Sequence, residues 1–425
     1  LSICSMKHYK YSIIAFSAVV LLGVPWLMNT YPRSILYIDQ AFKYVGNNIA
    51  TVFLNKSITV TQLHDKYNAV SNGNPKVRIL LVPGHEPNFG GTEYGNLKER
   101  DINVELAGYL KDFFKMNNHY DIVVSRNKTG WNADLQKYFD GHWDEIMSFI
   151  KANKGEMLRQ VNNGTVMKVR DGVMHNTAPQ NVGIRLFGIN KWVNENNIDI
   201  AIHIHFNDYP RKNIGTPGKY SGFAIYVPEK QFSNSTTTRE VANAVFRRLA
   251  KYNAISDLPK EDSGVIEEQN LIAIGSYNTL DAPSMLIEYG YIYETQFNDP
   301  DIRESILKDL AFQTYLGIQD FFGSGNDVSL AYDTLVLPHL WNENLNKNST
   351  DKNAVLALQT ALLLEGTYPG VGKSKNDCPR TGRFGPCTSD ALLVFQNKYK
   401  IKNEKNIVGD ETKKVLNRLY SVQIR

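Results

Sequence analysis

Histidine and carboxylate side chains follow three apolar runs of the sequence, at the point where each run ends. The first run leads into His85, the second ends in HIHFND with His203 and His205, and the third ends in Glu288. A further carboxylate, Glu99, lies in the sequence KERD. Imidazole nitrogens and carboxylate oxygens are common zinc ligands, with one position left open for water in catalytic sites. These residue types indicate a metal site, provided that the fold brings the three ends together.

Structural roles are open for each of these side chains. His85 could cap the next helix, Glu99 could complement the positive end of that helix, and Glu288 could form a structural ion pair. His203 and His205 lie two residues apart, so on a strand both point to the same face of a sheet. His205 is nearer the carboxyl end and is the better candidate ligand. His203 is expected to be a hydrogen-bonded core residue or one that supports the ligands.

The apolar runs have the length of β-strands, and amphipathic helical patterns lie between them. Strand-like runs span residues 77–82, 121–125, 198–205, 222–227 and 284–288, and helical patterns include residues 101–115, 241–249 and 302–310. Nearly continuous apolar strands that alternate with helices predict an α/β fold, with a mainly parallel sheet covered by helices on both faces. Ligands of such sheets bind at the carboxyl ends of the strands, where the candidate residues lie.

The length of 425 residues suggests two or three domains. The α/β pattern covers residues 76–324, and residues 31–75 are predicted to be a spacer. Residues 325–350 lack periodicity and are predicted to be a linker. Residues 351–425 contain three short apolar helical patterns, which predict a small three-helix domain.

Composition and charge exclude several classes of protein. Lys and Arg number 47 against 43 Asp and Glu, a net charge of +4 without a long basic run, so nucleic acid is not an expected partner. With 42% hydrophobic and 21% charged residues, the chain has the composition of an ordinary globular protein. Three cysteines are too few for a disulfide-dense scaffold or a four-cysteine metal site.

The N-terminal region predicts export. The uncharged stretch Ser12–Met28 follows basic residues, which indicates a signal peptide or signal-anchor within residues 1–30 and an extracytoplasmic location for the rest. No small-residue cleavage site follows this stretch, which slightly favours a retained membrane anchor, and Met6 is a candidate initiator. In an oxidising compartment, Cys378 and Cys387 are close enough in sequence to form one local disulfide.

Four segments of the predicted α/β domain match, in order and spacing, the motifs of a known family. They are LLVPGHEPNFGG, KERDINVELAGYL, HIHFND and PSMLIEYGY, between about residues 77 and 322. This arrangement resembles the zinc-dependent N-acetylmuramoyl-L-alanine amidases of bacterial cell walls, which hydrolyse the amide between the lactyl group of N-acetylmuramic acid and L-alanine of peptidoglycan. The resemblance implies that His85, Glu99 and His205 hold Zn²⁺ and that Glu288 is the catalytic carboxylate.

The sequence departs from this family in three places, one of which is Tyr289 and Tyr291 in place of a more aliphatic Leu and Phe. Glu86-Pro87 stands where a Gly-Gly pair is usual, and an insertion spans about residues 131–182, ahead of Arg185, which resembles an Arg of the family. Some members use a helix in this region to occlude zinc until a partner removes it. By analogy, residues 134–151 could form a gate released by an activator protein. An additional packing or substrate-groove element is the alternative.

Residues 351–425 resemble the three-helix peptidoglycan-binding modules, through the segments VLALQTALL, GRFGP, FQ and IVG. Such a module would tether the enzyme and raise the local concentration of its substrate. Two alternative functions remain: a zinc carboxypeptidase or endopeptidase acting on the stem peptide, and a non-catalytic wall-binding protein. The presence of all four expected site residues argues against the second alternative.

Overall fold

The computed structural model describes residues 57–169, 172–173, 178–211, 213, 215–324 and 332–421. The predicted signal or anchor segment within residues 1–30 lies outside these ranges, as does most of the predicted spacer. Within the ranges described, no helix is both long and apolar enough to cross a membrane.

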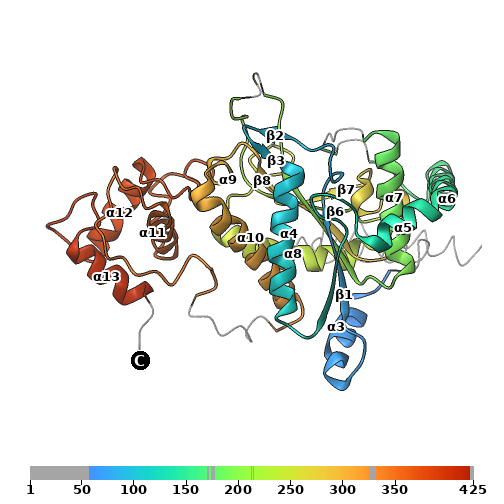
Figure 1. Ribbon diagram of the computed structural model, residues 1–425, viewed down its shortest axis with the longest axis horizontal. Coiled ribbons are helices and arrows are strands. Elements are labelled where there is room, and N and C mark those ends of the chain that lie inside the picture. The colour runs from blue at the N-terminus through green and yellow to red at the C-terminus, as the bar shows by residue number, and fades with distance from the viewer. Residues whose placement is uncertain are drawn as a thin grey trace, which may run out of the picture. The chain divides into compact units, whose positions relative to one another are not determined.

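A six-stranded sheet forms the centre of the α/β domain (Figure 1). Its strands are β1 (Val77–Pro83), β4 (Tyr120–Val124), β5 (Ile200–Asn207), β6 (Ala224–Pro228), β7 (Val265–Glu268) and β8 (Ser284–Tyr291). Their order is β4-β1-β5-β8-β6-β7, and every neighbouring pair is parallel except β6 and β8. The mainly parallel sheet predicted from the sequence is therefore confirmed. A separate two-stranded hairpin joins β2 (Glu93–Tyr94) to β3 (Leu97–Lys98).

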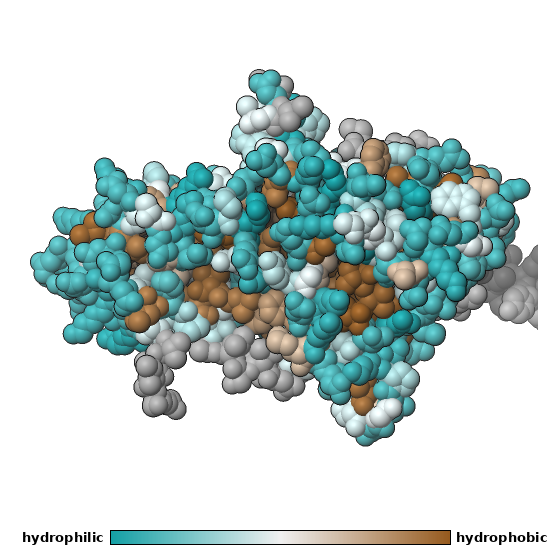
Figure 2. All heavy atoms as spheres, viewed as in Figure 1, coloured by the Kyte–Doolittle hydropathy of each residue, from teal (hydrophilic) through white to brown (hydrophobic). Residues whose placement is uncertain are grey.

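Helices cover both faces of the sheet. The main helices are α4 (Glu99–Lys115), α8 (Ser235–Tyr252) and α10 (Pro300–Phe321) on one face, and α5 (Ala133–Gly141), α6 (Trp143–Asn162) and α7 (Gln180–Glu195) on the other (Figure 1). Ile202 and Ile204 of β5 pack on the first face, with α4, α8 and α10. Because strand side chains alternate, His203 and His205 point to the second face. On the side seen in Figure 2, hydrophilic residues cover most of the surface.

Helix α4 shows how the sequence pattern produces this packing. Its buried apolar residues Ile102, Leu106, Leu110 and Phe114 recur every four positions, so they form one stripe against the sheet. Burial of each such side chain is worth about 1.5–3 kcal/mol. The opposite stripe is polar and stays in solvent. The amphipathic pattern therefore fixes both the rotation of α4 and the position of its first residue, Glu99.

The segment before β1 packs on the domain instead of forming a loose spacer. Thr59 and Gln62 form a capping box that starts α3 (Val60–Ala69), which is followed by a 3-10 turn. Leu63 and Tyr67 of this helix are buried in the main core. The folded unit therefore begins well before residue 76, the boundary that the sequence pattern predicts.

The C-terminal region has its own hydrophobic core. It contains the three predicted helices, α11 (Lys352–Leu364), α12 (Pro386–Lys398) and α13 (Asp410–Tyr420). Leu337, Trp341 and Leu345, from the predicted linker, are buried in the same core, so residues 332–350 belong to the packed module. Cys378 and Cys387 form the predicted disulfide.

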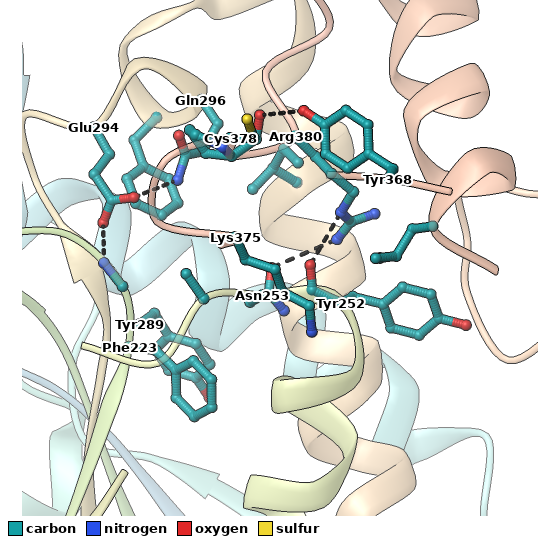
Figure 3. Close-up of a pocket in the computed structure, with 16 residues that line it drawn as sticks. Phe223, Tyr252, Asn253, Tyr289, Glu294, Gln296, Tyr368, Lys375, Cys378 and Arg380 are labelled. Atoms are coloured by element: carbon teal, nitrogen blue, oxygen red, sulfur yellow. Dashed lines mark hydrogen bonds between the residues drawn. The ribbon is translucent and has the colours of Figure 1, made fainter. Parts of the chain in front are cut away.

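The C-terminal module contacts the end of α8 through buried polar groups (Figure 3). Arg380 donates to the carbonyl of Tyr252 at 3.2 Å and pairs with Asp309 of α10 at 3.3 Å. Lys375 donates to the carbonyl oxygens of Ala250 and Lys251. The cavity between these groups has a volume of about 30 Å³, which is room for little more than a water molecule. This contact is a closed interface and not a ligand site.

Candidate active site

The carboxyl ends of β1 and β5 and the N-terminus of α4 bring three predicted residues together. An oxygen of Glu99 lies 2.8 Å from Nε2 of His85, and its other oxygen lies 3.1 Å from Nδ1 of His205. One donor atom from each of the three residues can be chosen so that all lie within 4.8 Å of one another. Among the residues described, this is the one group of three or more His, Cys, Asp or Glu side chains with such geometry.

The charge states of the cluster suit a metal. Burial alone would raise the pKa of Glu99, but interactions with His85 and His205 outweigh it and hold the pKa below its usual value. Burial lowers the pKa of His205. A carboxylate binds metal in its ionised form and an imidazole in its neutral form, and these are the forms that the shifts favour for Glu99 and His205. The backbone N–H groups of Thr92 and Phe206 also donate to Glu99, at 3.0 and 3.2 Å, and fix its two oxygens.

The turn after β1 is shaped around the histidines. A Cβ atom on Gly84 would lie 2.1 Å from the ring of His205, so only glycine fits there. His85 itself has a φ of 70°, a left-handed conformation that is unfavourable for a non-glycine residue. Arg126, buried at the end of β4, donates to the carbonyl oxygens of Pro83 and Gly84 and holds the turn in place. Arg126 was not among the site residues predicted from the sequence. A charged residue directly after an apolar strand was the available signal.

Glu288 lies beside this cluster on the same face of the sheet. It is the register partner of His205 on the neighbouring strand β8. Its Oε2 is buried, and no hydrogen-bond partner for it lies among the residues described. Burial, together with the carboxylates of Glu99 and Glu261, raises the pKa of Glu288 well above its ordinary value. A carboxyl group that has a raised pKa, and one oxygen without a hydrogen-bond partner among the described residues, is suited to proton transfer and not to a structural ion pair.

A buried network next to Glu288 was missed by the sequence analysis. Glu261 is fully buried and accepts hydrogen bonds from Asn207 (3.1 Å), Ser256 (2.5 Å) and Tyr291 (3.2 Å). It also accepts one from the hydroxyl of Tyr226. Glu261 thereby anchors the end of β5 just after His205. Its loop carries no motif, so nothing in the sequence singled it out.

The expectation of a hydrogen bond for His203 is not met. Its side chain is 1% exposed, and neither ring nitrogen has a partner within the described part of the chain. Burial lowers its pKa to about 3, so it is neutral at physiological pH. His203 does not belong to the cluster of His85, Glu99 and His205, in agreement with the prediction that His205 is the better candidate ligand of the two.

The inserted helices α5 and α6 pack into the second face of the sheet. Leu135, Phe139 and Ile146 are buried in one cluster with Leu80 and Val82 of β1. Among the described residues, no hydrogen bond or ion pair joins either helix to the four site residues. This burial favours the packing or groove alternative over the gate.

The departure at Glu86 also has a structural reason. Glu86 is buried, and its carboxylate pairs with Arg185 of α7 at 2.8 Å. The pair ties the loop that carries His85 to the helix that follows the insertion. A carboxylate can therefore replace the usual small residue because Arg185 neutralises it.

Comparison with protein families identifies the chain. Residues 79–319 match the family model described as N-acetylmuramoyl-L-alanine amidase. Because the match spans more than half of the sequence, the chain belongs to this family and is an enzyme that hydrolyses the amide bond between N-acetylmuramic acid and L-alanine in peptidoglycan. No curated protein matches the sequence.

Several solved amidase structures are similar to part of the chain. The CwlD amidase of Clostridioides difficile, solved in complex with the GerS lipoprotein, is 15% identical, with 58% of this chain and 99% of that chain covered and a TM-score of 0.37. The amidase Ami1 of Mycobacterium smegmatis is 13% identical, with 59% and 100% covered and a TM-score of 0.38. An amidase of Clostridium difficile 630 is 18% identical, with 60% and 99% covered and a TM-score of 0.34. These similarities are low, so the family membership follows from the family model.

Proposed function

We propose that the amidase uses Zn²⁺ held by His85, Glu99 and His205. The observation that carries this proposal is the placement of one buried carboxylate between two imidazoles, at 2.8 and 3.1 Å. Donor atoms about 2.0–2.2 Å from a zinc ion lie roughly 3.3–3.6 Å from one another. In the cluster, the donor atoms of the three residues lie within 4.8 Å of one another, with contacts as short as 2.8 and 3.1 Å, so this separation falls inside the observed range. Two imidazoles and one carboxylate are also a donor set that catalytic zinc sites use.

Glu288 is the proposed general base. Zinc with three protein ligands supplies an open position and a Lewis acid for the water and the scissile carbonyl. Glu288 takes the proton of the attacking water and returns it to the leaving amine of L-alanine. Its place beside His205, and its buried Oε2, to which no described residue hydrogen-bonds, support this role. No Ser or Cys nucleophile is needed for this reaction.

Replacing Glu261 with Gln is expected to shift the acidic limb of kcat/KM to lower pH. Burial, Glu99 and Glu261 all raise the pKa of Glu288, so removal of one negative charge lowers it. A base must be ionised, and activity therefore falls as the pH drops through this pKa. In the variant the fall comes at lower pH, which a pH–rate profile measures. Glu404→Gln, at a shielded carboxylate in the C-terminal module, is the matched control. An unmoved limb, or one at higher pH, would contradict the prediction.

We also propose that the C-terminal module binds peptidoglycan and that the enzyme acts outside the cytoplasm. The sequence resemblance of residues 351–425 supports the first point. The disulfide between Cys378 and Cys387 and the apolar stretch within residues 1–30 support the second, because disulfides persist in oxidising compartments.

The products of wall digestion test the proposed reaction. The amidase is expected to release peptides that begin with L-alanine and to leave glycan chains with free lactyl groups. Mass spectrometry of purified wall after digestion measures both products. Shortened stem peptides still attached to sugar would instead indicate a carboxypeptidase or endopeptidase. Absence of any product from the zinc-loaded protein would indicate a wall-binding protein without activity.

A further inference from the structure

An open groove of about 290 Å³ lies next to the loop that carries His85. The loop after β1, the loop after β4, the inserted helices α5 and α6, and Arg185 of α7 line it. Glu86, on the wall of the groove, directly follows His85 in the chain, so the groove borders the loop that carries one proposed zinc ligand. The inserted helices thus form part of a groove, although neither helix holds any of the four site residues in position.

Aromatic side chains form one part of the wall. Trp131 and Trp143 both line the groove and are partly exposed. Trp131 is held by an edge contact with Phe139, with ring centroids 5.2 Å apart and an angle of 82°. The loop before it is closed by Asn127, whose side chain accepts from the backbone of Thr129 and Gly130. Trp131 is therefore held in place before a ligand binds.

The remaining wall is polar and suited to hydroxyl and acetamido groups. Gln136 and Asp140 of α5 line the groove and are hydrogen-bonded to each other at 2.9 Å. Asn88 and Thr129 add further donors and acceptors from the two loops. Apolar ring faces with a few directed polar groups are typical of small-molecule sites. A pyranose ring matches this surface, because its C–H face packs on indole and its hydroxyl groups bond to amide and carboxylate side chains.

The charges in the wall favour sugar over stem peptide. Arg185 is the one Arg or Lys among the lining residues, and it is already paired with Glu86 at 2.8 Å. A stem peptide carries carboxylates, which Asp140 would repel, and the lining holds no unpaired Arg or Lys to offset this repulsion. N-acetylated sugar rings of the strand are neutral and meet no such repulsion.

We propose that this groove binds a sugar ring of the glycan strand and that Trp143 is its stacking platform. The proposal rests on the proposed function only in taking peptidoglycan as the substrate. It assigns the insertion a role in substrate positioning, in which the strand is held beside the metal while the adjoining amide enters the site.

The test compares wild type with Trp143→Ala, Trp143→Phe and Asp140→Asn. The probe is a peptide-free oligosaccharide of N-acetylglucosamine, which carries no carboxylate. Hydrogen exchange followed by mass spectrometry reports binding locally, so binding to the C-terminal module does not interfere. We expect the probe to protect residues 127–147 in wild type and not in Trp143→Ala. We also expect about a tenfold rise in KM for purified wall, equivalent to about 1.4 kcal/mol, with little change in kcat, because the variant loses the apolar ring surface that the sugar covers. Trp143→Phe should restore part of both effects.

The matched control is Met147→Ala, at a 45% exposed apolar residue of α6 that does not line the groove. It should behave as wild type. Unchanged protection and KM in Trp143→Ala would overturn the proposal, as would protection of residues 127–147 by free stem peptide but not by the oligosaccharide. If Trp143→Ala does not fold, Asp140→Asn, at an exposed position, provides the second test: without the charge of Asp140, free stem peptide should protect residues 127–147, which it should not do in wild type, and an unchanged response to stem peptide would overturn the charge argument. Failure of the wall-digestion experiment would reject the proposed reaction, whereas oligosaccharide binding is measured independently of turnover.

Discussion

Replacing Glu288 with Ala is expected to remove hydrolysis of peptidoglycan while zinc remains bound. Glu288 is outside the donor cluster, and no described residue hydrogen-bonds to its Oε2, so its loss leaves His85, Glu99 and His205 in place. Loss of a general base typically lowers turnover by about 10²- to 10⁴-fold. Zinc content by atomic spectroscopy and turnover on purified wall, measured on the same sample, check both halves of the prediction.

The matched control for this variant is Glu304→Ala, at an exposed carboxylate of α10 that forms an ion pair with a surface lysine, Lys308. It should retain both zinc and turnover. A Glu288→Ala protein that kept most of its turnover would remove Glu288 from the mechanism. One that lost zinc as well would show that Glu288 supports the ligands and is not solely a base.

Replacing His205 with Ala is expected to abolish zinc binding and activity together. His205 supplies one of three donors and contacts the shared carboxylate Glu99 at 3.1 Å. Groups that merely support metal ligands typically change affinity by about 10- to 100-fold, and removal of a ligand should exceed that range. Zinc affinity from competition with a chelator, together with turnover, provides the measurement.

His203→Gln is the matched control, because His203 lies on the same strand and faces the same side but is outside the cluster. This variant should keep the metal. If His203→Gln lost zinc and His205→Ala retained it, the ligand assignment would have to be exchanged between the two histidines.

The fold class and the family could be predicted from the sequence because both depend on local patterns. Strand-length apolar runs alternate with helical stripes such as that of α4, and this alternation defines a parallel α/β sheet. Polar residues at the ends of those strands must then meet at one edge. His85, His205 and Glu288 could be selected on this basis, although their roles came from the family motifs.

Three parts of the fold could not be predicted from the sequence, each for a specific physical reason. Strand β7 has four residues and little periodicity in its sequence, so it forms a strand because it hydrogen-bonds to β6. Trp341 and Leu345 lie in a polar stretch that resembles a linker, yet both are buried against the C-terminal helices. Helix α3 is short and mostly polar, and its burial depends on two side chains, Leu63 and Tyr67.

The sequence by itself determined the chemistry available to this protein: two imidazoles, two carboxylates and the motifs that place them at strand ends. The tertiary structure alone decided how those groups are held. The pairing of Glu86 with Arg185, the burial of Glu261 against Asn207 and the support that Arg126 gives to the turn all join residues far apart in the chain. Periodicity reports which face of an element is buried, but not which distant side chain it meets, and it is these contacts that set the distances and pKa values of the site.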